Sequence, residues 1–178
     1  MRKALHMMGI LSERDLEWLL SHGQTKFAIA GSTVVQEGKP VNALFILLDG
    51  KFSVRASDEQ NREIATLYPG EILGEISFVD ARPPSASVVA VQDSHMLVVN
   101  AESLSDKLER DEGFAARFFR ALATFLADRL RTTSGRFGYG KQLENHRHDD
   151  DELDDSILDN ASLGARRFND MLKRLRIN

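Results

Sequence analysis

The chain has 178 residues, of which 42% are apolar and 28% charged, a balance typical of one domain with appendages, or at most two small domains. Its net charge of −4 argues against binding nucleic acid through a broad basic face. It contains no cysteine, which excludes disulfides, thiolate chemistry and cysteine-ligated metal sites.

The amino-terminal segment predicts a helix and no leader sequence. It lacks the apolar core of a signal peptide, and no stretch of the chain approaches the length that spans a bilayer, so we expect a cytoplasmic protein. Residues 9–22 contain a capping box in which Ser12 caps and Asp15 follows three residues on. The apolar residues on one face of this helix are Ile10, Leu11, Leu16, Leu19 and Leu20.

The middle of the chain, from residue 27 to about residue 99, consists of short β-rich runs broken by glycine. Asp49-Gly50 predicts a hairpin, because φ > 0 is easily adopted there. Regularly spaced short strands predict a small barrel or jelly roll, a mainly β fold with flanking helices. The expected strands are Phe27–Ile29, Thr33–Gln36, Ala43–Leu48, Lys51–Ala56, Glu63–Leu67, Ser87–Val91 and His95–Val99.

A long helix is expected after the strands. Residues 101–108 predict a short helix and residues 113–133 a long one. Phe119 and Leu122 widen the apolar stripe of the long helix beyond what packing on a single barrel requires. The stripe indicates a homodimer seam, and the alternative is that the helix only covers the barrel. Its apolar positions are Phe114, Phe118, Phe119, Leu122, Phe125, Leu126 and Leu130.

The carboxyl-terminal part divides into a linker and a tail. An acidic run at residues 149–159 predicts a flexible acidic linker over residues 138–160. Residues 161–178 predict a basic amphipathic tail helix that is too short to be stable alone. We expect it to fold against its own domain, a partner or an anionic surface. Its apolar residues are Phe168, Met171, Leu172 and Leu175, and its basic residues are Arg166, Arg167, Lys173, Arg174 and Arg176.

The segment from residue 74 to residue 88 has the residues of a pocket for a cyclic phosphate. Backbone N–H groups at the start of a one-turn helix, about Ile76 and Ser77, suit an anion because donors and dipole point outward there. Glu75 can accept a hydrogen bond from a ribose 2′-hydroxyl. The candidate ligand-binding residues of this segment are Gly74, Glu75, Ile76, Ser77, Arg82 and the small residues Ser85, Ala86 and Ser87.

Over roughly residues 10–137 the chain resembles the cyclic nucleotide-binding domain family, and the comparison reaches furthest with the catabolite activator protein group. Residues 74–88 look like the phosphate-binding cassette of that family. Residues 126–134 are similar to its C-helix, in which a Thr-Ser pair contacts adenine, and the matching residues are Thr133 and Ser134. The glycines that look like the punctuation of its β-roll are Gly31, Gly38, Gly50, Gly70 and Gly74.

The resemblance implies a β-roll followed by a long C-helix over residues 1–137. It also implies a homodimer, because the serine of the Thr-Ser pair reaches across the dimer in the activator group. The implied ligand is a cyclic nucleotide, cAMP rather than cGMP. No other cofactor is implied.

The cassette departs from the family pattern at Pro84, which stands where an arginine should meet the phosphate. Proline brings no charge and removes a backbone donor. A lost charge-assisted bond costs roughly 1.5–3 kcal/mol, or about 10- to 100-fold in affinity. Arg82, two residues earlier, is the candidate to replace it, because its long side chain can swing back. The alternative is that Arg82 is a solvated loop residue.

Catalysis and metal binding lack support in the sequence. His146 and His148 lie beside an acidic run but have no second shell. A metal-binding cupin needs converging histidines, and His95 is the one candidate among the expected strands. There is no nucleophile–base pair, P-loop or dinucleotide fingerprint, so we expect neither an enzyme nor catalytic or metal-ligating residues.

The activator group places a winged helix-turn-helix after its long helix. Residues 138–178 hold an acidic run and one short amphipathic helix, which argues against sequence-specific DNA binding. The leading interpretation is a dimeric regulatory sensor that signals through its long helix and tail to a protein partner. The alternative is a scaffold protein with an empty or repurposed pocket, which Pro84 favours. A membrane-surface adaptor rests on the basic tail alone.

Overall fold

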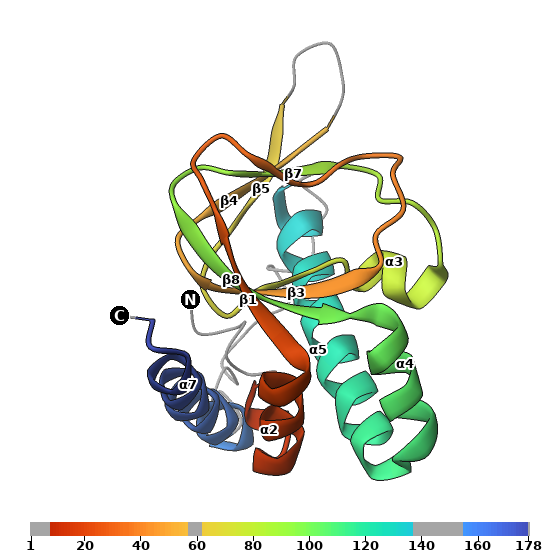
Figure 1. Ribbon diagram of the computed structural model, residues 1–178, viewed down its shortest axis with the longest axis vertical. Coiled ribbons are helices and arrows are strands. Elements are labelled where there is room, and N and C mark those ends of the chain that lie inside the picture. Colours follow the sequence, from red (N-terminus) through yellow and green to blue (C-terminus); the bar gives the residue numbers. More distant parts are fainter. Residues whose placement is uncertain (1–7, 57–61, 137–154, 178) are drawn as a thin grey trace, which may run out of the picture.

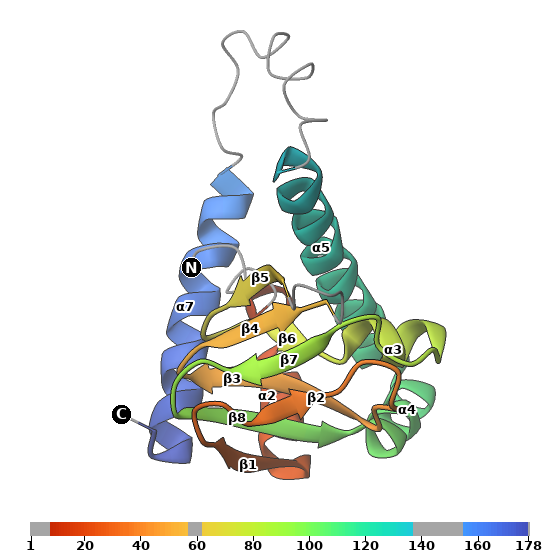
Figure 2. The same ribbon diagram turned by 90° about the horizontal axis from the view of Figure 1, so that it is seen from above.

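The computed structural model describes residues 8–56, 62–136 and 155–177, and of residues 133–136 and 155–160 it describes the backbone only. The described strands form two antiparallel four-stranded sheets that face each other as a β-roll (Figures 1 and 2). This arrangement confirms the mainly β fold expected from the sequence. The strands are β1 (Gly23–Ala28), β2 (Thr33–Val35), β3 (Ala43–Asp49), β4 (Phe52–Arg55), β5 (Glu63–Leu67), β6 (Ile72–Leu73), β7 (Ser87–Ala90) and β8 (Ser94–Asn100).

The sheets have the strand orders β1-β8-β3-β6 and β2-β7-β4-β5. Asp49-Gly50 links β3 to β4, but these strands belong to different sheets and do not pair, so the predicted hairpin is wrong and the turn connects the two sheets. Gly50 has φ +99°. A Cβ at this position would lie 2.1 Å from Ser94 Oγ, so the turn requires glycine. The turn at Gly50 therefore joins the two sheets in close contact with Ser94.

β3 is buried on both faces, which explains its continuous apolar sequence. Leu47 belongs to the core inside the roll, together with Phe52 and Met96. Leu44 and Ile46 belong to a second core on the outer face of the first sheet, where the helices pack. The roll thus has one core inside it and one beneath the helices.

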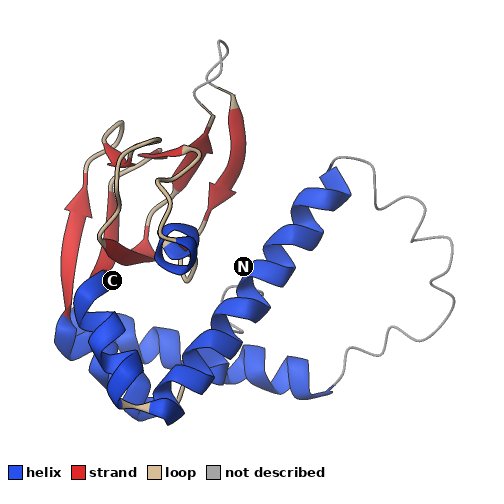
Figure 3. Cartoon of the chain, turned by 90° about the vertical axis from the view of Figure 1, so that its right-hand side faces the viewer, coloured by secondary structure: helices blue, strands red, loops and turns tan. Residues whose placement is uncertain are grey.

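The described helices lie largely on one side of the roll. Figure 1 and Figure 3 show α2, α4 and α7 grouped there, while α5 rises past α3. The predicted capping box starts α2: Ser12 Oγ accepts from the Asp15 backbone N–H at 3.2 Å, and Asp15 Oδ2 accepts from the Ser12 N–H at 2.8 Å. The helices are α2 (Glu13–His22), α3 (Glu75–Asp80), α4 (Ala101–Arg110), α5 (Glu112–Arg136) and α7 (Asp155–Leu175).

The long helix α5 packs on the helical core through its first half. Phe114, Phe118 and Leu122 are buried in that core. On the same helix Phe119 is 48% exposed and Leu130 is 68% exposed. These exposed apolar side chains are consistent with the expected seam, and the homodimer stays a prediction.

The tail helix begins earlier than the sequence predicted. α7 starts at Asp155, so residues 155–160, expected to belong to the linker, are helical. Acidic residues are favourable in the first turn of a helix because they face its positive dipole end, so the acidic run does not mark a linker throughout. Residues 137–154 of the expected linker lie outside the described residues.

α7 packs on α2 of its own chain (Figure 1). Phe168 and Met171 are 6% and 2% exposed and join the helical core. Arg174 Nη1 lies 3.6 Å from Glu17 Oε1. Of the three surfaces considered for the tail, its own domain is the one it covers. Within the described residues, no helix has both the length and the apolar character needed to cross a membrane.

Candidate functional site

A cavity of about 330 Å³ lies between the start of α3, the segment before β7 and the far half of α5. Its apolar walls come from the β-roll, including Val54 and Val88. Seven of the predicted ligand-binding residues line this one cavity: Gly74, Glu75, Ile76, Ser77, Arg82, Ser85 and Ala86. The structure thus brings most of the candidate residues together, and their binding of a ligand stays a prediction.

Gly74 makes the sharp turn that points Glu75 into the cavity. It precedes α3 with φ +83°, a conformation that favours glycine. A Cβ here would lie 2.6 Å from the Ala43 carbonyl oxygen in β3. The glycine of the Gly-Glu motif is therefore required by the close approach of α3 to the sheet.

Glu75 is buried, with 2% of its surface exposed. Its Oε1 forms an ion pair with Nη1 of Arg129, which reaches the cavity from α5. Burial raises the pKa of Glu75 above its ordinary value, and the charge of Arg129 offsets part of that effect. A carboxylate held in this way is a strong hydrogen-bond acceptor.

Arg129 is the main site residue that the sequence interpretation missed. Its guanidinium lies 5.7 Å from the centre of the Phe125 ring, and its side chain is 29% exposed. Arg129 lies one turn before Thr133, so the two positions share a face of the helix. That spacing, applied to the C-helix match, was the signal that could have identified it.

Pro84, which puts the phosphate site in doubt, and Arg82, the candidate to replace the missing arginine, both border the cavity. Arg82 is exposed, and its backbone N–H donates to Asp80 Oδ1 at 3.0 Å. Arg82 also borders a neighbouring cavity between α3 and α4. The Pro84 carbonyl accepts a hydrogen bond from the Gly38 N–H at 2.9 Å, which fixes this segment against the turn after β2.

Ser87 differs from the other small residues of the segment. It is the first residue of β7 and is not among the residues that line the cavity. Its Oγ accepts a hydrogen bond from the Glu37 N–H at 3.0 Å. The hydroxyl therefore holds the turn after β2, whereas Ser85 and Ala86 face the cavity.

Thr133 and Ser134 belong to the last turns of α5, and their side chains lie outside the described residues. Their adenine contact stays a prediction. His146 and His148 also lie outside the described residues. In the part of the chain that the structure describes, no cluster of acidic or histidine side chains could hold a metal ion. His95 packs its ring against Phe27, with 5.0 Å between ring centres.

Comparison with known proteins agrees with this geometry. Residues 26–111 match the family model of the cyclic nucleotide-binding domain. This segment is a cyclic nucleotide-binding domain. A domain with this fold from Methylobacillus flagellatus superposes with a TM-score of 0.67 at 26% identity, over 71% of this chain and 72% of that one. The family expected from the sequence is therefore confirmed.

Two curated relatives carry the same domain in longer proteins. The cyclic AMP receptor protein of Thermus thermophilus is 32% identical over 123 residues, which are 68% of this chain and 55% of the relative. The Pycsar effector protein XpPycTIR of Xanthomonas perforans is 29% identical over 114 residues, 64% of this chain and 37% of the relative. The chain thus spans between about a third and a half of these relatives.

Proposed function

We propose that the cavity binds a cyclic nucleoside monophosphate and that the chain is a regulatory sensor rather than an enzyme. The observation that carries this proposal is the convergence of Glu75, Arg129 and the Ser85–Ala86 segment in one cavity of about 330 Å³. That volume lies in the range of small-molecule pockets, which runs from about 300 to 1,000 Å³.

The chemistry of the cavity matches the two polar parts of such a ligand. Glu75 accepts a hydrogen bond from the ribose 2′-hydroxyl. The phosphate lies against Ser85 and Ala86, whose small side chains allow it to approach the backbone. Apolar walls, including Val54 and Val88, cover the rest of the ligand.

Arg129 supplies the positive charge that Pro84 does not. A guanidinium carries several N–H donors in a fixed fork, so it can bridge a carboxylate and a phosphate oxygen. Arg82 at the rim of the cavity is a second, more solvated cation. In this proposal the phosphate charge is met from the long helix rather than from the cassette.

α5 transmits the effect of ligand binding to the rest of the protein. Because Arg129 belongs to α5, ligand binding and the position of this helix are linked. The exposed Phe119 and Leu130 form part of a homodimer seam along the same helix. A protein partner binds the helix and the tail and responds to their position. Thr133 and Ser134, one turn beyond Arg129, contact the base and favour cAMP over cGMP.

Isothermal titration of the full chain with cAMP and cGMP tests the proposal. We expect saturable one-site binding, tighter for cAMP. Arg129→Gln should weaken binding about tenfold, because a charge-assisted contact is lost. Arg131→Gln removes the same charge from the exposed face of α5 and should change affinity by less than about twofold. A folded protein that gives no heat at about millimolar nucleotide would leave the scaffold alternative, which Pro84 favours.

A further inference from the structure

The tail helix holds the segment that precedes α2. Arg167 Nη1 donates hydrogen bonds to the carbonyl oxygens of Gly9 at 3.0 Å, Met8 at 3.3 Å and Leu11. Carbonyl groups at the end of a helical turn carry partial negative charge, so a guanidinium is a favourable partner. α7 thereby holds residues 8–11, the segment that leads into α2.

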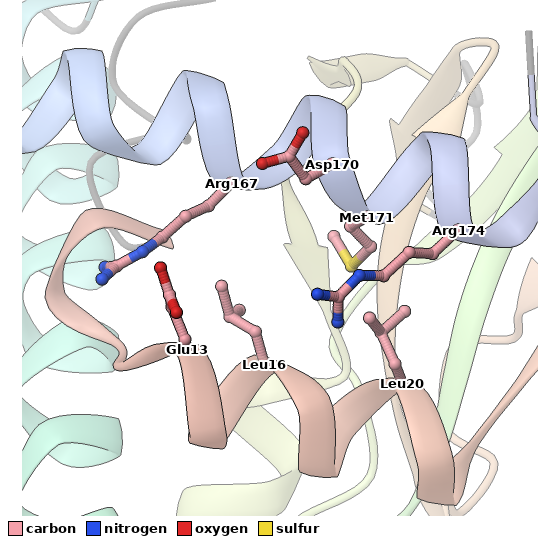
Figure 4. Close-up of a pocket in the computed structure, with 7 residues that line it drawn as sticks. All are labelled: Glu13, Leu16, Leu20, Arg167, Asp170, Met171 and Arg174. Carbon is pink, nitrogen blue, oxygen red and sulfur yellow. The ribbon is translucent and has the colours of Figure 1, made fainter.

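Apolar contacts fasten α7 to α2 itself. Figure 4 shows Leu16 and Leu20 of α2 pointing towards α7, and Met171 pointing back between them. Only a small cavity of about 110 Å³ remains at this contact. Because Met171 is 2% exposed, the contact is part of the protein core and not a surface touch.

α2 is in turn tied to α5 by an ion pair between a buried carboxylate and a partly exposed guanidinium. Asp15, which is 3% exposed, accepts from Arg117 through both oxygens, with Nε–Oδ2 at 2.6 Å and Nη2–Oδ1 at 2.9 Å. Phe114 and Phe118 of α5 lie in the same apolar core as the buried residues of α7. α5 is therefore tied to α2 by this ion pair and shares an apolar core with α7.

The far end of α5 reaches the ligand cavity. Arg129 follows Arg117 by twelve positions, or roughly 18 Å of helix. Its ion pair with Glu75 depends on where α5 lies over the β-roll. A continuous set of contacts thus runs from α7 through α2 and α5 to Glu75.

We propose that α7 is an allosteric support of the ligand cavity. Docking of α7 on α2 holds α5 where Arg129 reaches Glu75, and a cyclic nucleotide bound there strengthens the docking of α7. The second statement follows from the first, because coupling between two binding events is reciprocal. This inference rests on the proposed function and gives the direction of the coupling: bound ligand favours the state in which α7 is docked on its own domain.

Nucleotide titrations of two α7 variants test the support of the cavity. Met171→Asp places a charge in the buried contact and should undock α7. It should lower cAMP affinity about fivefold or more, within the usual range of allosteric coupling. Asn169→Asp adds the same charge on the exposed side of α7, and its affinity should stay within about twofold of the wild type. Unchanged affinity in Met171→Asp, with α7 shown to be undocked by its hydrogen exchange, would overturn the proposal.

Hydrogen exchange of residues 161–175 tests the same coupling, first by comparing variants in the absence of ligand. Arg129→Gln should speed exchange of these amides about fivefold, whereas Arg131→Gln should leave it near the wild-type rate. Adding cAMP to the wild type should slow the exchange of the same amides. If the wild type binds no nucleotide, the proposed function fails, and the exchange of Arg129→Gln still decides whether α7 and the cavity are coupled. Equal exchange in both variants and the wild type would contradict the coupling.

Discussion

Glu75→Ala should lower cyclic-nucleotide affinity by about 10- to 100-fold and leave the fold intact. The expected loss is that of a hydrogen bond to a charged group, about 1.5–3 kcal/mol. Stability should change little, by about 1 kcal/mol or less, because the native protein already bears the cost of burying this carboxylate. The Arg129 side chain is 29% exposed, so in this variant it can turn towards water.

Titration calorimetry and urea unfolding of Glu75→Ala separate these two effects. Glu109→Ala, which removes the same side chain from the exposed face of α4, is the matched control and should bind like the wild type. A variant that loses several kcal/mol of unfolding free energy together with its affinity would show that Glu75 is structural. Retained affinity would remove Glu75 from the ligand site.

The protonation of Glu75 adds a pH dependence to the same result. Burial raises its pKa above the ordinary value of 4.5 despite the opposing charge of Arg129. The carboxylate therefore gains its proton at a higher pH than a free glutamate. The ribose hydroxyl donates to the charged carboxylate, so wild-type affinity should decrease as the pH is lowered, and the decrease should already have begun before the pH reaches 4.5. Calorimetry over the same pH range should show no such decrease in Glu75→Ala.

Arg117→Met should destabilise the fold by about 2 kcal/mol near neutral pH. Removing Arg117 leaves Asp15 charged and buried, while the Ser12 backbone N–H still donates to its Oδ2. Breaking a fully buried ion pair costs roughly 3–5 kcal/mol, but the Arg117 side chain is 39% exposed and water screens part of the interaction. Methionine keeps most of the apolar stem, so the loss reports on the charge.

The sign of the pH dependence follows from the pKa of Asp15. Burial alone would raise this pKa, but the hydrogen bonds from Arg117 and Ser12 outweigh it and hold the pKa below the ordinary value of 3.8. The pair therefore stabilises the native protein fully above about pH 3.8 and less as the pH falls through the native pKa. In Arg117→Met the burial effect has less opposition and the pKa of Asp15 rises.

Urea unfolding at several pH values measures this difference. The gap in unfolding free energy between the wild type and Arg117→Met should shrink on acidification from neutral pH to below 3.8. Arg120→Met, on the exposed side of the same helix, should cost less than about 0.5 kcal/mol at every pH. A gap that does not change with pH would mean that Arg117 acts by packing and not by its charge.

The fold was predictable where glycine turns separate apolar runs, because a turn such as Asp49-Gly50 marks where one strand ends and the next begins. The pairing was not predictable from that turn, since β3 and β4 lie in different sheets. The edge strand β1 was placed too late, at Phe27 instead of Gly23. Its residues Gln24 to Lys26 are polar and exposed, so they lack the alternation that identifies a half-buried strand. β6 was missed because its two residues are too few to form a pattern.

The site was predictable as far as it is local in sequence. One motif, residues 74–88, contains Gly74, Glu75 and the small residues before β7, so these residues are identified together. Arg129 meets Glu75 across 54 positions, and that contact depends on how α5 packs over the roll. Closeness in sequence therefore indicated Arg82, and not Arg129, as the cation that replaces the arginine missing at Pro84.

A crystal structure of the full chain with cAMP tests the central claim most directly. The account predicts nucleotide in the cavity beside α3, with its ribose 2′-hydroxyl within hydrogen-bond distance of Glu75. It also predicts the phosphate beside Ser85, in contact with the guanidinium of Arg129. A complex in which the nucleotide lies outside this cavity, or in which Arg129 has no contact with the phosphate, would contradict the account.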